Sequence, residues 1–449
     1  MTGSLIKALG LASVASATLQ IVPGATWTAA GTNQHVQAHG GGIIEVDSTF
    51  YWIGENKLGG SSFQSVNCYS SKNLVEWTFV GELLSRQSSG DLGPNRVLER
   101  PHVVYNDATS KYVMWMHIDS SNYGEAKSGV ATSSSVCGAY EYIGSFQPLG
   151  HESRDIGLYK DDDGTGYLLT EDRPNGLRIN KLTDDYTNVT ETIHLFPEHI
   201  EAPAMYKQDG VYFLFGSQLT TWIANNDNKY VTARSLSGPW TDWENFAPSG
   251  AKTFESQTTF VVAVGDSVLY MGDRWDSENL MRSTYIWLPL TIDGTKATLQ
   301  NEANWVLPLE GTWSTGGSEK NYAAESSNNM LSNGAKVISC SSCSGGKSVG
   351  YLGGSDDGTL RISNLAGVGS APITLRIRYA NGDSSQRYAN ITVNDQSHVL
   401  AFLPSGSGNT PFTSTLHITL DKGDVYTVTF SGYKGGWGPD VDELIVPQE

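Results

Sequence analysis

Short apolar strands separated by polar turns recur along the first 290 residues of the chain. Each unit is an apolar strand, a tight turn such as Asp209-Gly210, and a second strand rich in aromatic and β-branched residues. A less regular sequence motif, such as Cys68 to Trp77, follows most of these hairpins and predicts a third strand with an outer turn. The five units begin 60, 56, 46 and 56 residues apart, at His39, Glu99, Asp155, Glu201 and Gln257.

A repeat of about 50 residues with several strands in each unit is typical of a β-propeller. Five repeats predict five blades over residues 20–312, with room for four strands in each. The innermost strand of every blade begins near the central axis of such a fold. We therefore expect the side chains of Glu99, Asp155, Glu201 and Gln257 to face one another.

The pattern changes after Pro308. Residues 313–320 are polar and rich in Gly and Ser, which indicates a linker. Residues 321–449 return to short alternating strands, for example Thr374–Tyr379 and Val425–Phe430, with a spacing that suits an antiparallel β-sandwich of the jelly-roll type. The predicted fold class is therefore all-β: a five-bladed β-propeller followed by a β-sandwich module.

The composition favours an exported protein. Only 17% of the 449 residues are charged, and the formal net charge of −18 argues against nucleic acid or an anionic membrane surface as a partner. Lys7, the apolar run that follows it and Ala15-Ser-Ala17 predict a secretory signal peptide within residues 1–19. We expect a secreted, extracellular protein, and no other apolar segment is long enough to span a membrane.

The four cysteines fit export as well. Cys340 and Cys343 lie close enough for a local disulfide, which leaves Cys68 to pair with Cys137, one of three possible arrangements. Asn188 and Asn390 begin glycosylation sequences, so we expect a glycoprotein.

The acidic residues that open the units point to hydrolysis of glycosidic bonds. That reaction requires one carboxylic acid to protonate the leaving oxygen and a second group to activate water or attack carbon. Carboxylates clustered on an axis are costly to bury, so stability does not explain them. The alternatives are that these residues bind a central ion or only cap the channel. The run Asp161-Asp-Asp163 fits a hairpin turn, because it lacks the alternating ligands of a calcium loop.

Side chains close to these acids are candidates for sugar binding. Trp52, Tyr123, Trp222 and Trp275 could offer flat faces to sugar rings, although most aromatic residues of a propeller pack between blades. Tyr123 and Trp222 are favoured because they lie in loops. Arg274 follows the fifth hairpin, where it could hydrogen-bond a carboxylate or a sugar hydroxyl.

Several of these motifs resemble glycoside hydrolase family 43 over residues 20–312: Ser153-Arg-Asp155, Ile200-Glu-Ala-Pro203, Ser71-Lys-Asn-Leu-Val-Glu-Trp77 and Ser237-Gly-Pro-Trp240. The resemblance implies a five-bladed propeller and inverting hydrolysis. It also implies that Glu201 is the general acid and that Asp155 orients it and tunes its pKa. The family's usual base aspartate would fall near His39, where no carboxylate stands.

This gap, together with Glu99-Arg-Pro101 and Ser256-Gln257, resembles the exo-β-1,3-galactanase branch of the family. The attacking water must then be held by Glu99 or Gln257. Because an amide is a poor base, we expect Gln257 to contact the water and Glu99 to support the substrate or the proton transfer. Glu55 is expected to bind a hydroxyl of the terminal sugar.

Residues 321–449 resemble carbohydrate-binding module family 35 in five motifs: Tyr322-Ala-Ala-Glu325, Gly350-Tyr-Leu-Gly-Gly354, Arg378-Tyr-Ala-Asn381, Val393-Asn394 and Gly438-Pro-Asp-Val-Asp442. The resemblance implies a structural calcium ion at Glu325 and Asp442, although Ala323 stands where a second acid is common. It also implies sugar-binding loop residues, namely Tyr351, Arg387, Trp437 and Asp440.

We therefore expect a secreted, monomeric exo-β-1,3-galactanase that needs no cofactor for catalysis. It would release galactose from β-1,3-galactan, the main chain of arabinogalactan, by inverting hydrolysis. One alternative is an α-L-arabinofuranosidase or β-xylosidase of the same family. Another is a non-catalytic galactan-binding lectin, which the missing base aspartate would explain.

Overall fold

The computed structural model describes residues 19–218, 226–406 and 410–448. Within these ranges the regular structure is almost entirely strand, which confirms the all-β prediction. The few helical turns are α1 (Lys252–Glu255), η1 (Pro148–Gly150), η2 (Leu280–Arg282), η3 (Ser344–Gly346) and η4 (Gly354–Asp356). Except for residue 19, the expected signal peptide lies outside the described residues, and so does Trp222.

The first body of the molecule consists of five four-stranded antiparallel sheets, each made of consecutive strands. The first sheet contains β1 (His39–Val46), β2 (Thr49–Glu55), β3 (Ser65–Ser71) and β4 (Thr78–Ser85). The second contains β5 (Arg96–Asn106), β6 (Lys111–Ser120), β7 (Lys127–Ser133) and β8 (Glu141–Phe146). The third contains β9 (Ile156–Lys160), β10 (Gly166–Asp172), β11 (Gly176–Leu182) and β12 (Val189–Phe196). The fourth contains β13 (Ile200–Gln208), β14 (Val211–Gln218), β15 (Asn228–Ala233) and β16 (Glu244–Asn245). The fifth contains β17 (Gln257–Val264), β18 (Ser267–Arg274), β19 (Thr284–Asp293) and β20 (Lys296–Leu299).

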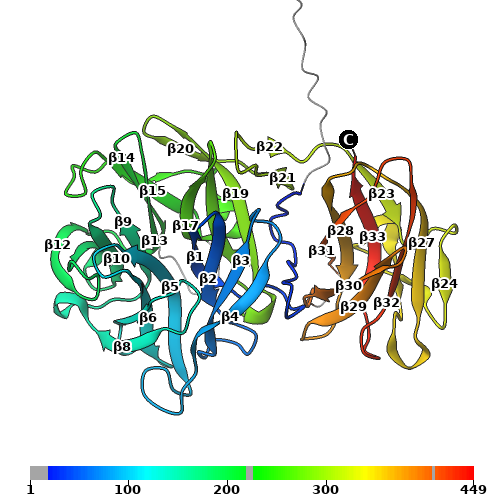
Figure 1. The fold of residues 1–449 in the computed structure, drawn as a ribbon, viewed down its shortest axis with the longest axis horizontal. Coiled ribbons are helices and arrows are strands. Elements are labelled where there is room, and N and C mark those ends of the chain that lie inside the picture. The colour runs from blue at the N-terminus through cyan, green and yellow to red at the C-terminus, as the bar shows by residue number, and fades with distance from the viewer. Residues whose placement is uncertain (1–18, 219–225, 407–409, 449) are drawn as a thin grey trace, which may run out of the picture.

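The first strands of the five sheets form a closed ring. Each contacts the first strand of the next sheet, and β17 returns to contact β1. In Figure 1 these strands lie inside the left-hand body, whereas β4, β8, β12 and β20 lie at its periphery. The ring encloses a cavity of about 500 Å³, lined by apolar residues such as Ile43, Val103, Leu158 and Met205. The four side chains predicted to converge stand toward the opposite end of the same strands: Gln257 begins β17, Asp155 precedes β9, Glu201 is the second residue of β13 and Glu99 is the fourth residue of β5.

A cluster of tryptophans packs the seam where the ring closes. Trp52 and Trp287 are 1% exposed, and their ring centroids lie 4.6 Å apart. Trp27, from the segment before β1, contacts both. Trp52 is therefore a core residue and offers no face to a sugar. Burying several large aromatic side chains here contributes many kcal/mol of hydrophobic free energy, on the order of 2 kcal/mol for each.

The second body consists of two sheets. One contains β23 (Glu319–Ala323), β25 (Lys336–Ser339), β26 (Lys347–Gly350), β28 (Pro372–Ala380), β31 (Phe412–Thr419) and β33 (Asp440–Pro447). The other contains β24 (Met330–Ser332), β27 (Thr359–Ala366), β29 (Arg387–Val393), β30 (Gln396–Phe402) and β32 (Val425–Gly432). Both sheets contribute to one apolar core, which includes Ile362 and Phe430 from the second and Leu375 and Leu444 from the first.

The two bodies lie side by side (Figure 1) and share hydrogen bonds through the segment before β1. The backbone N–H of Gln20 donates to Thr374 Oγ1, and the hydroxyl groups of Thr26 and Tyr379 lie 2.9 Å apart. The segment expected to be a linker, 313–320, is itself tied down, because β22 (Ser314–Thr315) pairs with β21 (Trp305–Val306).

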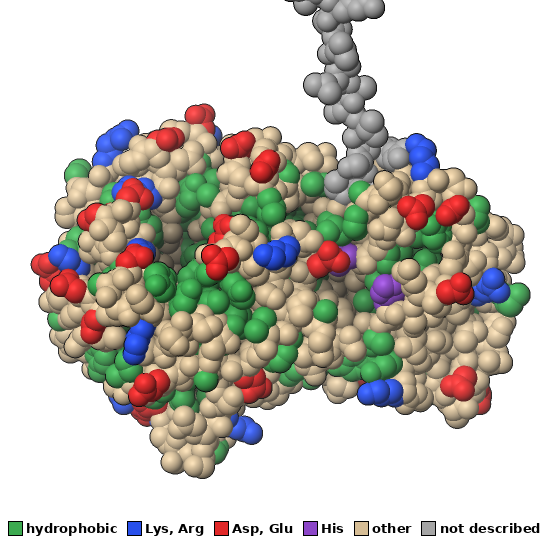
Figure 2. Space-filling view, viewed as in Figure 1, with side chains coloured by type: hydrophobic (Ala, Val, Ile, Leu, Met, Phe, Trp, Pro, Cys, Tyr) green, Lys and Arg blue, Asp and Glu red, His purple; other side chains and the backbone are tan. Residues whose placement is uncertain are grey.

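Both predicted disulfides are present. Cys68 in β3 is bonded to Cys137, and Cys340 is bonded to Cys343. No helix in the described ranges has the length and apolarity needed to cross a membrane. Acidic side chains are spread over both bodies on the face shown in Figure 2, in keeping with the net charge of −18.

Candidate active site

Backbone bulges aim the polar residues that open the first strands. The strand register shifts between His39 and Gly42, between Glu99 and His102, and between Glu201 and Ala204. The residue after the opening residue has a positive φ in all three cases: 63° at Gly40, 51° at Arg100 and 57° at Ala202. Such a bulge bends the strand and redirects a side chain, and bulges are over-represented next to active sites.

Glu201 and Asp155 lie together, as predicted. The backbone N–H of Ala202 donates to Asp155 Oδ2 at 3.0 Å, which ties the two strand starts to each other. Burial, then the negative charges of Asp155 and Glu171, raise the pKa of Glu201 to about 8, although Arg100 and Arg173 oppose the shift. A carboxyl group in these surroundings remains protonated at neutral pH.

Arg100 is the central cation of the site. Its Nε lies 2.8 Å from Asp155 Oδ2, and its Nη2 donates to Gln257 Oε1 at the same distance. Its backbone N–H donates to Glu55 Oε1 at 3.3 Å. Arg100 therefore connects the strand starts of two other sheets through its planar guanidinium, and contacts Glu55 of a third through its backbone N–H.

Gln257 has a defined amide orientation. Its Oε1 accepts from Arg100 Nη2 and from Trp275 Nε1, the latter at 2.9 Å. Its Nε2 donates to Glu201 Oε1, also at 2.9 Å. Both lone pairs of the amide oxygen are occupied by donors, so a flipped amide would place N–H groups against N–H groups. The structure thus holds the ordinary amide form, with one N–H on Glu201.

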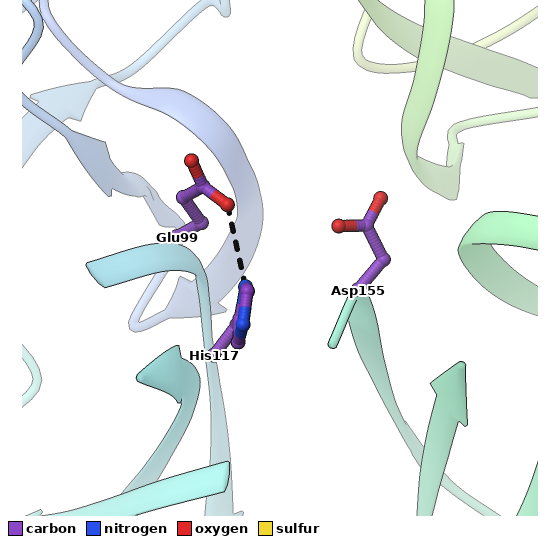
Figure 3. Close-up of side chains that lie close together, drawn as sticks. All are labelled: Glu99, His117 and Asp155. Atoms are coloured by element: carbon purple, nitrogen blue, oxygen red, sulfur yellow. Dashed lines mark hydrogen bonds and ion pairs between the residues drawn. The ribbon is translucent and has the colours of Figure 1, made fainter. Parts of the chain in front are cut away.

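Glu99 faces Asp155 across the ring, beside a buried histidine (Figure 3). Glu99 Oε2 lies 3.3 Å from His117 Nδ1, and Glu99 Oε1 accepts from the Tyr123 hydroxyl at 2.8 Å. Burial alone would raise the pKa of Glu99, but hydrogen bonds from His117 and Tyr123 and the charge of Lys57 lower it to about 2. Glu99 is therefore ionised at every working pH.

His117 is held as a cation between two carboxylates. Burial would lower its pKa, but hydrogen bonds to Asp119 and Glu99 raise it to about 9. His117 Nε2 lies 3.0 Å from Asp119 Oδ2, so both ring nitrogens face acids. Glu99, His117 and Asp155 have metal-ligand atoms within 4.8 Å of one another. A metal would require the neutral imidazole, whereas this environment favours the protonated ring, so the donor set fits a metal poorly.

Glu55 and Lys57 form a buried ion pair beside Glu99. Lys57 Nζ lies 2.5 Å from Glu55 Oε2 and 3.9 Å from Glu99 Oε1. Burial raises the pKa of Glu55 to about 7, although Lys57 lowers it and Glu99 raises it further. Glu55, predicted as a sugar ligand, is thus brought to the cluster that includes Glu99.

The first strand lacks a carboxylate at its start, and Asp273 from β18 fills part of this gap. Asp273 Oδ2 accepts from the backbone N–H of Gly40 at 2.5 Å, and its Oδ1 lies 3.5 Å from His39 Nδ1. His39 stacks on Tyr285, with ring centroids 4.8 Å apart. Asp273 is 1% exposed, so it supports the backbone at this position.

Arg274, predicted to hydrogen-bond a carboxylate or a sugar hydroxyl, hydrogen-bonds two backbone carbonyl groups in the structure. Its Nη2 donates to the backbone carbonyl of Phe254 at 2.9 Å, and its Nε lies 3.4 Å from the carbonyl of Glu255. The side chain alternates away from its neighbour Asp273 along β18, as strand geometry requires. The site residue from this strand end is instead Trp275, through its bond to Gln257.

Four residues of the second body that were predicted to hold a sugar lie near one another. The exposed rings of Tyr351 and Trp437 meet edge to face, with centroids 6.2 Å apart. Arg387 Nη1 donates to the carbonyl of Gly438 at 3.0 Å, next to Trp437. Burial raises the pKa of Asp440, and Arg387 opposes the shift. Two exposed aromatic faces with a nearby cation and carboxylate are chemically suited to a sugar ring.

The two predicted calcium ligands both lie against the turn that follows the Cys340–Cys343 bridge, Asp442 at Ser344 and Glu325 at Gly345. Asp442 Oδ1 accepts from the backbone N–H of Ser344, whereas Asp442 Oδ2 and Glu325 Oε2 are buried with no hydrogen-bond partner among the described residues. Burial raises the pKa of Asp442 to about 6; the charge of Glu325 adds to this shift, and Arg378 opposes it. Asp442 Oδ2 lies in an ion pair 3.5 Å from Arg378 Nη2. Buried carboxylate oxygens without hydrogen bonds fit a hard, oxygen-seeking cation, so these two residues could hold calcium.

Sequence reasoning missed five residues of the catalytic cluster: Lys57, Arg100, His117, Glu171 and Arg173. Two of them carried a usable signal. Arg100 directly follows Glu99 in the sequence, and His117 lies opposite Glu99 in the β5–β6 hairpin. The remaining contacts depend on rotamers, which a strand pattern does not report.

A buried acid with a raised pKa, held against an aspartate and facing an ionised carboxylate, defines a glycosidase-like site. Comparison with known proteins agrees. The model of glycosyl hydrolases family 43 matches residues 37–259. A crystal structure of an exo-β-1,3-galactanase from Phanerochaete chrysosporium with β-1,3-galactotriose is 38% identical, covers 96% of this chain and 100% of that one, and has a TM-score of 0.67.

Two further relatives extend the comparison. An exo-β-1,3-galactanase structure from Clostridium thermocellum is 26% identical, covers 94% of this chain and 99% of that one, and has a TM-score of 0.62. A β-D-galactofuranosidase from Aspergillus niger is 24% identical over 253 residues, which are 53% of this chain and 71% of that protein. The chain belongs to glycosyl hydrolase family 43 and is a glycoside hydrolase.

Proposed function

We propose that the protein is an exo-β-1,3-galactanase that releases galactose from β-1,3-galactan with inversion. The observation that carries the proposal is the arrangement around Glu201: a carboxyl group kept protonated, held beside Asp155, and hydrogen-bonded by the amide of Gln257. The similarity to two exo-β-1,3-galactanases over nearly the whole chain supports the choice of substrate.

In this mechanism Glu201 donates its proton to the leaving oxygen. Asp155 holds the strand start of Glu201 in place and keeps a negative charge beside it, which favours the protonated acid. Arg100 pairs with Asp155 and so balances that charge.

Activation of the attacking water is assigned to Gln257 and Glu99. The oxygen of Gln257 is occupied by Arg100 and Trp275, so the group that it can offer a water molecule is its second amide N–H. Gln257 then positions the water, and the ionised Glu99 accepts its proton. A carboxylate whose pKa is near 2 is a weak base, and His117 and Tyr123 would have to loosen their hold on Glu99 as the proton arrives.

We also propose an architecture and a location for this activity. The ring of five sheets is a five-bladed β-propeller, and the second body is a β-sandwich that binds galactan through Tyr351 and Trp437. Glu325 and Asp442 hold a structural calcium ion there. Residues 1–19 act as a secretory signal, and the enzyme works as an extracellular monomer that needs no catalytic cofactor.

The direct test follows the anomeric configuration of galactose released from linear β-1,3-galactan by proton NMR. The wild type is expected to release the α-anomer first, and Glu201→Gln to lose at least a hundredfold in kcat. Glu191→Gln, an exposed change on β12, serves as the control. Release of the β-anomer would contradict the mechanism, and activity retained by Glu201→Gln would contradict the assigned acid.

The likeness to a β-D-galactofuranosidase favours a second candidate, a furanosidase of the same family. Nitrophenyl β-D-galactofuranoside and α-L-arabinofuranoside, assayed beside β-1,3-galactobiose, separate the two. A kcat/KM at least tenfold higher on a furanoside would replace the galactanase proposal. Binding of galactan without turnover of any of these substrates would support the alternative that the protein is a non-catalytic galactan-binding lectin.

A further inference from the structure

A second carboxylate, Glu171, lies buried behind Glu201 and Asp155. It stands near the end of β10, and its backbone N–H donates to the carbonyl of Asp155 at 2.9 Å. Its side chain is 2% exposed, and its Oε2 has no hydrogen-bond partner among the described residues. A buried, ionisable group without full hydrogen bonding costs stability, so its position calls for an explanation beyond packing.

Arg173 connects Glu171 to Glu201. Arg173 Nε lies 2.6 Å from Glu171 Oε1, and Arg173 Nη2 lies 3.6 Å from Glu201 Oε2. The other carboxyl oxygen of Glu201, Oε1, accepts from Gln257. Each oxygen of Glu201 therefore faces a different neighbour, one a neutral amide and the other a guanidinium that Glu171 orients.

The charges that face Glu201 balance. Asp155 from the start of β9 and Glu171 from β10 are acidic, whereas Arg100 from β5 and Arg173 from the turn after β10 are basic; Gln257 from β17 is neutral. Asp155 and Arg100 pair directly, and so do Glu171 and Arg173. Removal of one member of the second pair leaves an uncompensated charge against Glu201.

We propose that Glu171 and Arg173 are positioning residues, which together orient the Glu201 carboxyl group and set the pH range over which it can donate its proton. The inference rests on the proposed role of Glu201 as general acid. Glu171 acts through Arg173 and through its charge, and it contacts no substrate.

The test is the pH dependence of kcat/KM on β-1,3-galactobiose, which reports on the free enzyme. Glu171→Gln leaves the positive charge of Arg173 facing Glu201 and favours ionisation of the acid. The basic limb of the profile is then expected to move about one unit toward lower pH, the smaller end of the shift produced by a nearby opposite charge. Glu191→Gln, on the exposed face of the same sheet, is expected to leave the limb in place.

A double variant separates charge from structure. Glu171→Gln combined with Arg173→Gln removes both charges, so the basic limb is expected to return at least halfway to its wild-type position. A double variant whose limb remains as low as in Glu171→Gln would overturn the inference, as would an unmoved limb in the single variant. Arg173 is partly exposed, so the single variant Arg173→Gln provides a second probe if Glu171→Gln does not fold. Arg173→Gln is expected never to move the basic limb of the pH profile to lower pH. A limb at lower pH in this variant would overturn the inference.

Failure of this inference and failure of the proposed function are distinguishable. If Glu201→Gln abolishes turnover and the Glu171 variants leave the limb unchanged, only the positioning role is wrong. If Glu201→Gln retains turnover, the acid itself is wrong, and movement of the limb would then have to arise from another group.

Discussion

At the scale of single residues, the carboxylates of the site differ in their hydrogen-bond donors and charged neighbours. Glu99 receives donors from His117 and Tyr123 and stays ionised, whereas Glu201 receives two negative neighbours and stays protonated. When two acids in one site have different surroundings, their pKa values differ, so one can donate a proton while the other accepts one. The sequence places the acids near one another, but the surroundings assign their roles.

The raised pKa of Glu201 implies a cost in stability that depends on pH. Its pKa is about 8 in the folded protein and near 4.5 when unfolded, so the folded state is disfavoured progressively as the pH rises from about 4.5 to 8. Glu201→Gln cannot ionise and escapes this cost. Its Tm is expected to exceed that of the wild type by a few degrees at pH 8 and to match it at pH 4.5. Thermal unfolding at both values checks this, and an equal gain at pH 4.5 would contradict the argument.

Gln257 offers a test of water positioning. Gln257→Ala removes a donor to Glu201 Oε1 and the amide N–H proposed to hold water, so kcat is expected to fall about a hundredfold or more on β-1,3-galactobiose, with a smaller change in KM. Azide is expected to restore turnover to Glu99→Ala, which lacks the proposed base, and not to Gln257→Ala. Near-normal kcat in Gln257→Ala would remove this residue from the mechanism.

At the scale of the elements, the bulges near the starts of the first strands orient the side chains of the site. Gly40 shows why one of these positions requires glycine: its φ is 63°, and an added Cβ would lie 2.6 Å from Glu55 Oε1. Gly40→Ala is therefore expected to lose about 1–3 kcal/mol of unfolding free energy and to raise KM by displacing Glu55.

A matched change separates backbone strain from this collision. Gly210 has a φ of 71° in the β13–β14 turn, and an added Cβ would meet nothing within 4 Å. Gly210→Ala is expected to cost about 1 kcal/mol from strain alone and to leave KM unchanged. Urea unfolding and Michaelis–Menten kinetics of both variants check the pair; an unchanged KM in Gly40→Ala would mean that Glu55 does not bind the sugar.

Much of the strand and hairpin structure could be predicted from the sequence, because strand alternation and turn residues are local signals. The hairpins that begin at His39, Glu99 and Glu201 appear where the pattern places them. The bulges could not be predicted, since Arg100 and Ala202 are not residues that ordinarily adopt positive φ. Arg274 shows a different limit: the position of a strand end identifies a region, whereas strand alternation decides which side chain faces the other site residues.

At the scale of the whole molecule, the second body reaches the rim of the catalytic cluster. The loop between β18 and β19 begins at Trp275, which holds Gln257, and continues to Asn279, whose Nδ2 donates to the carbonyl of Ser384 at 3.0 Å. Asp276 braces the loop from within, through the backbone N–H of Asn279 and through Arg282. The second body therefore supports a residue that orients the amide of Gln257, in addition to any part in holding polymer.

These two roles of the second body predict different kinetics. Asn279→Ala loosens the loop and is expected to lower kcat a few-fold on both β-1,3-galactobiose and β-1,3-galactan, because the loss lies at Trp275 and Gln257. Trp437→Ala removes an exposed ring and is expected to weaken action on the polymer alone, since a disaccharide cannot span the two bodies. Parallel assays on the two substrates decide the matter. If Asn279→Ala behaves like Trp437→Ala, the contact with Ser384 serves only to join the two bodies, and the rigidity of Trp275 arises within the ring of sheets.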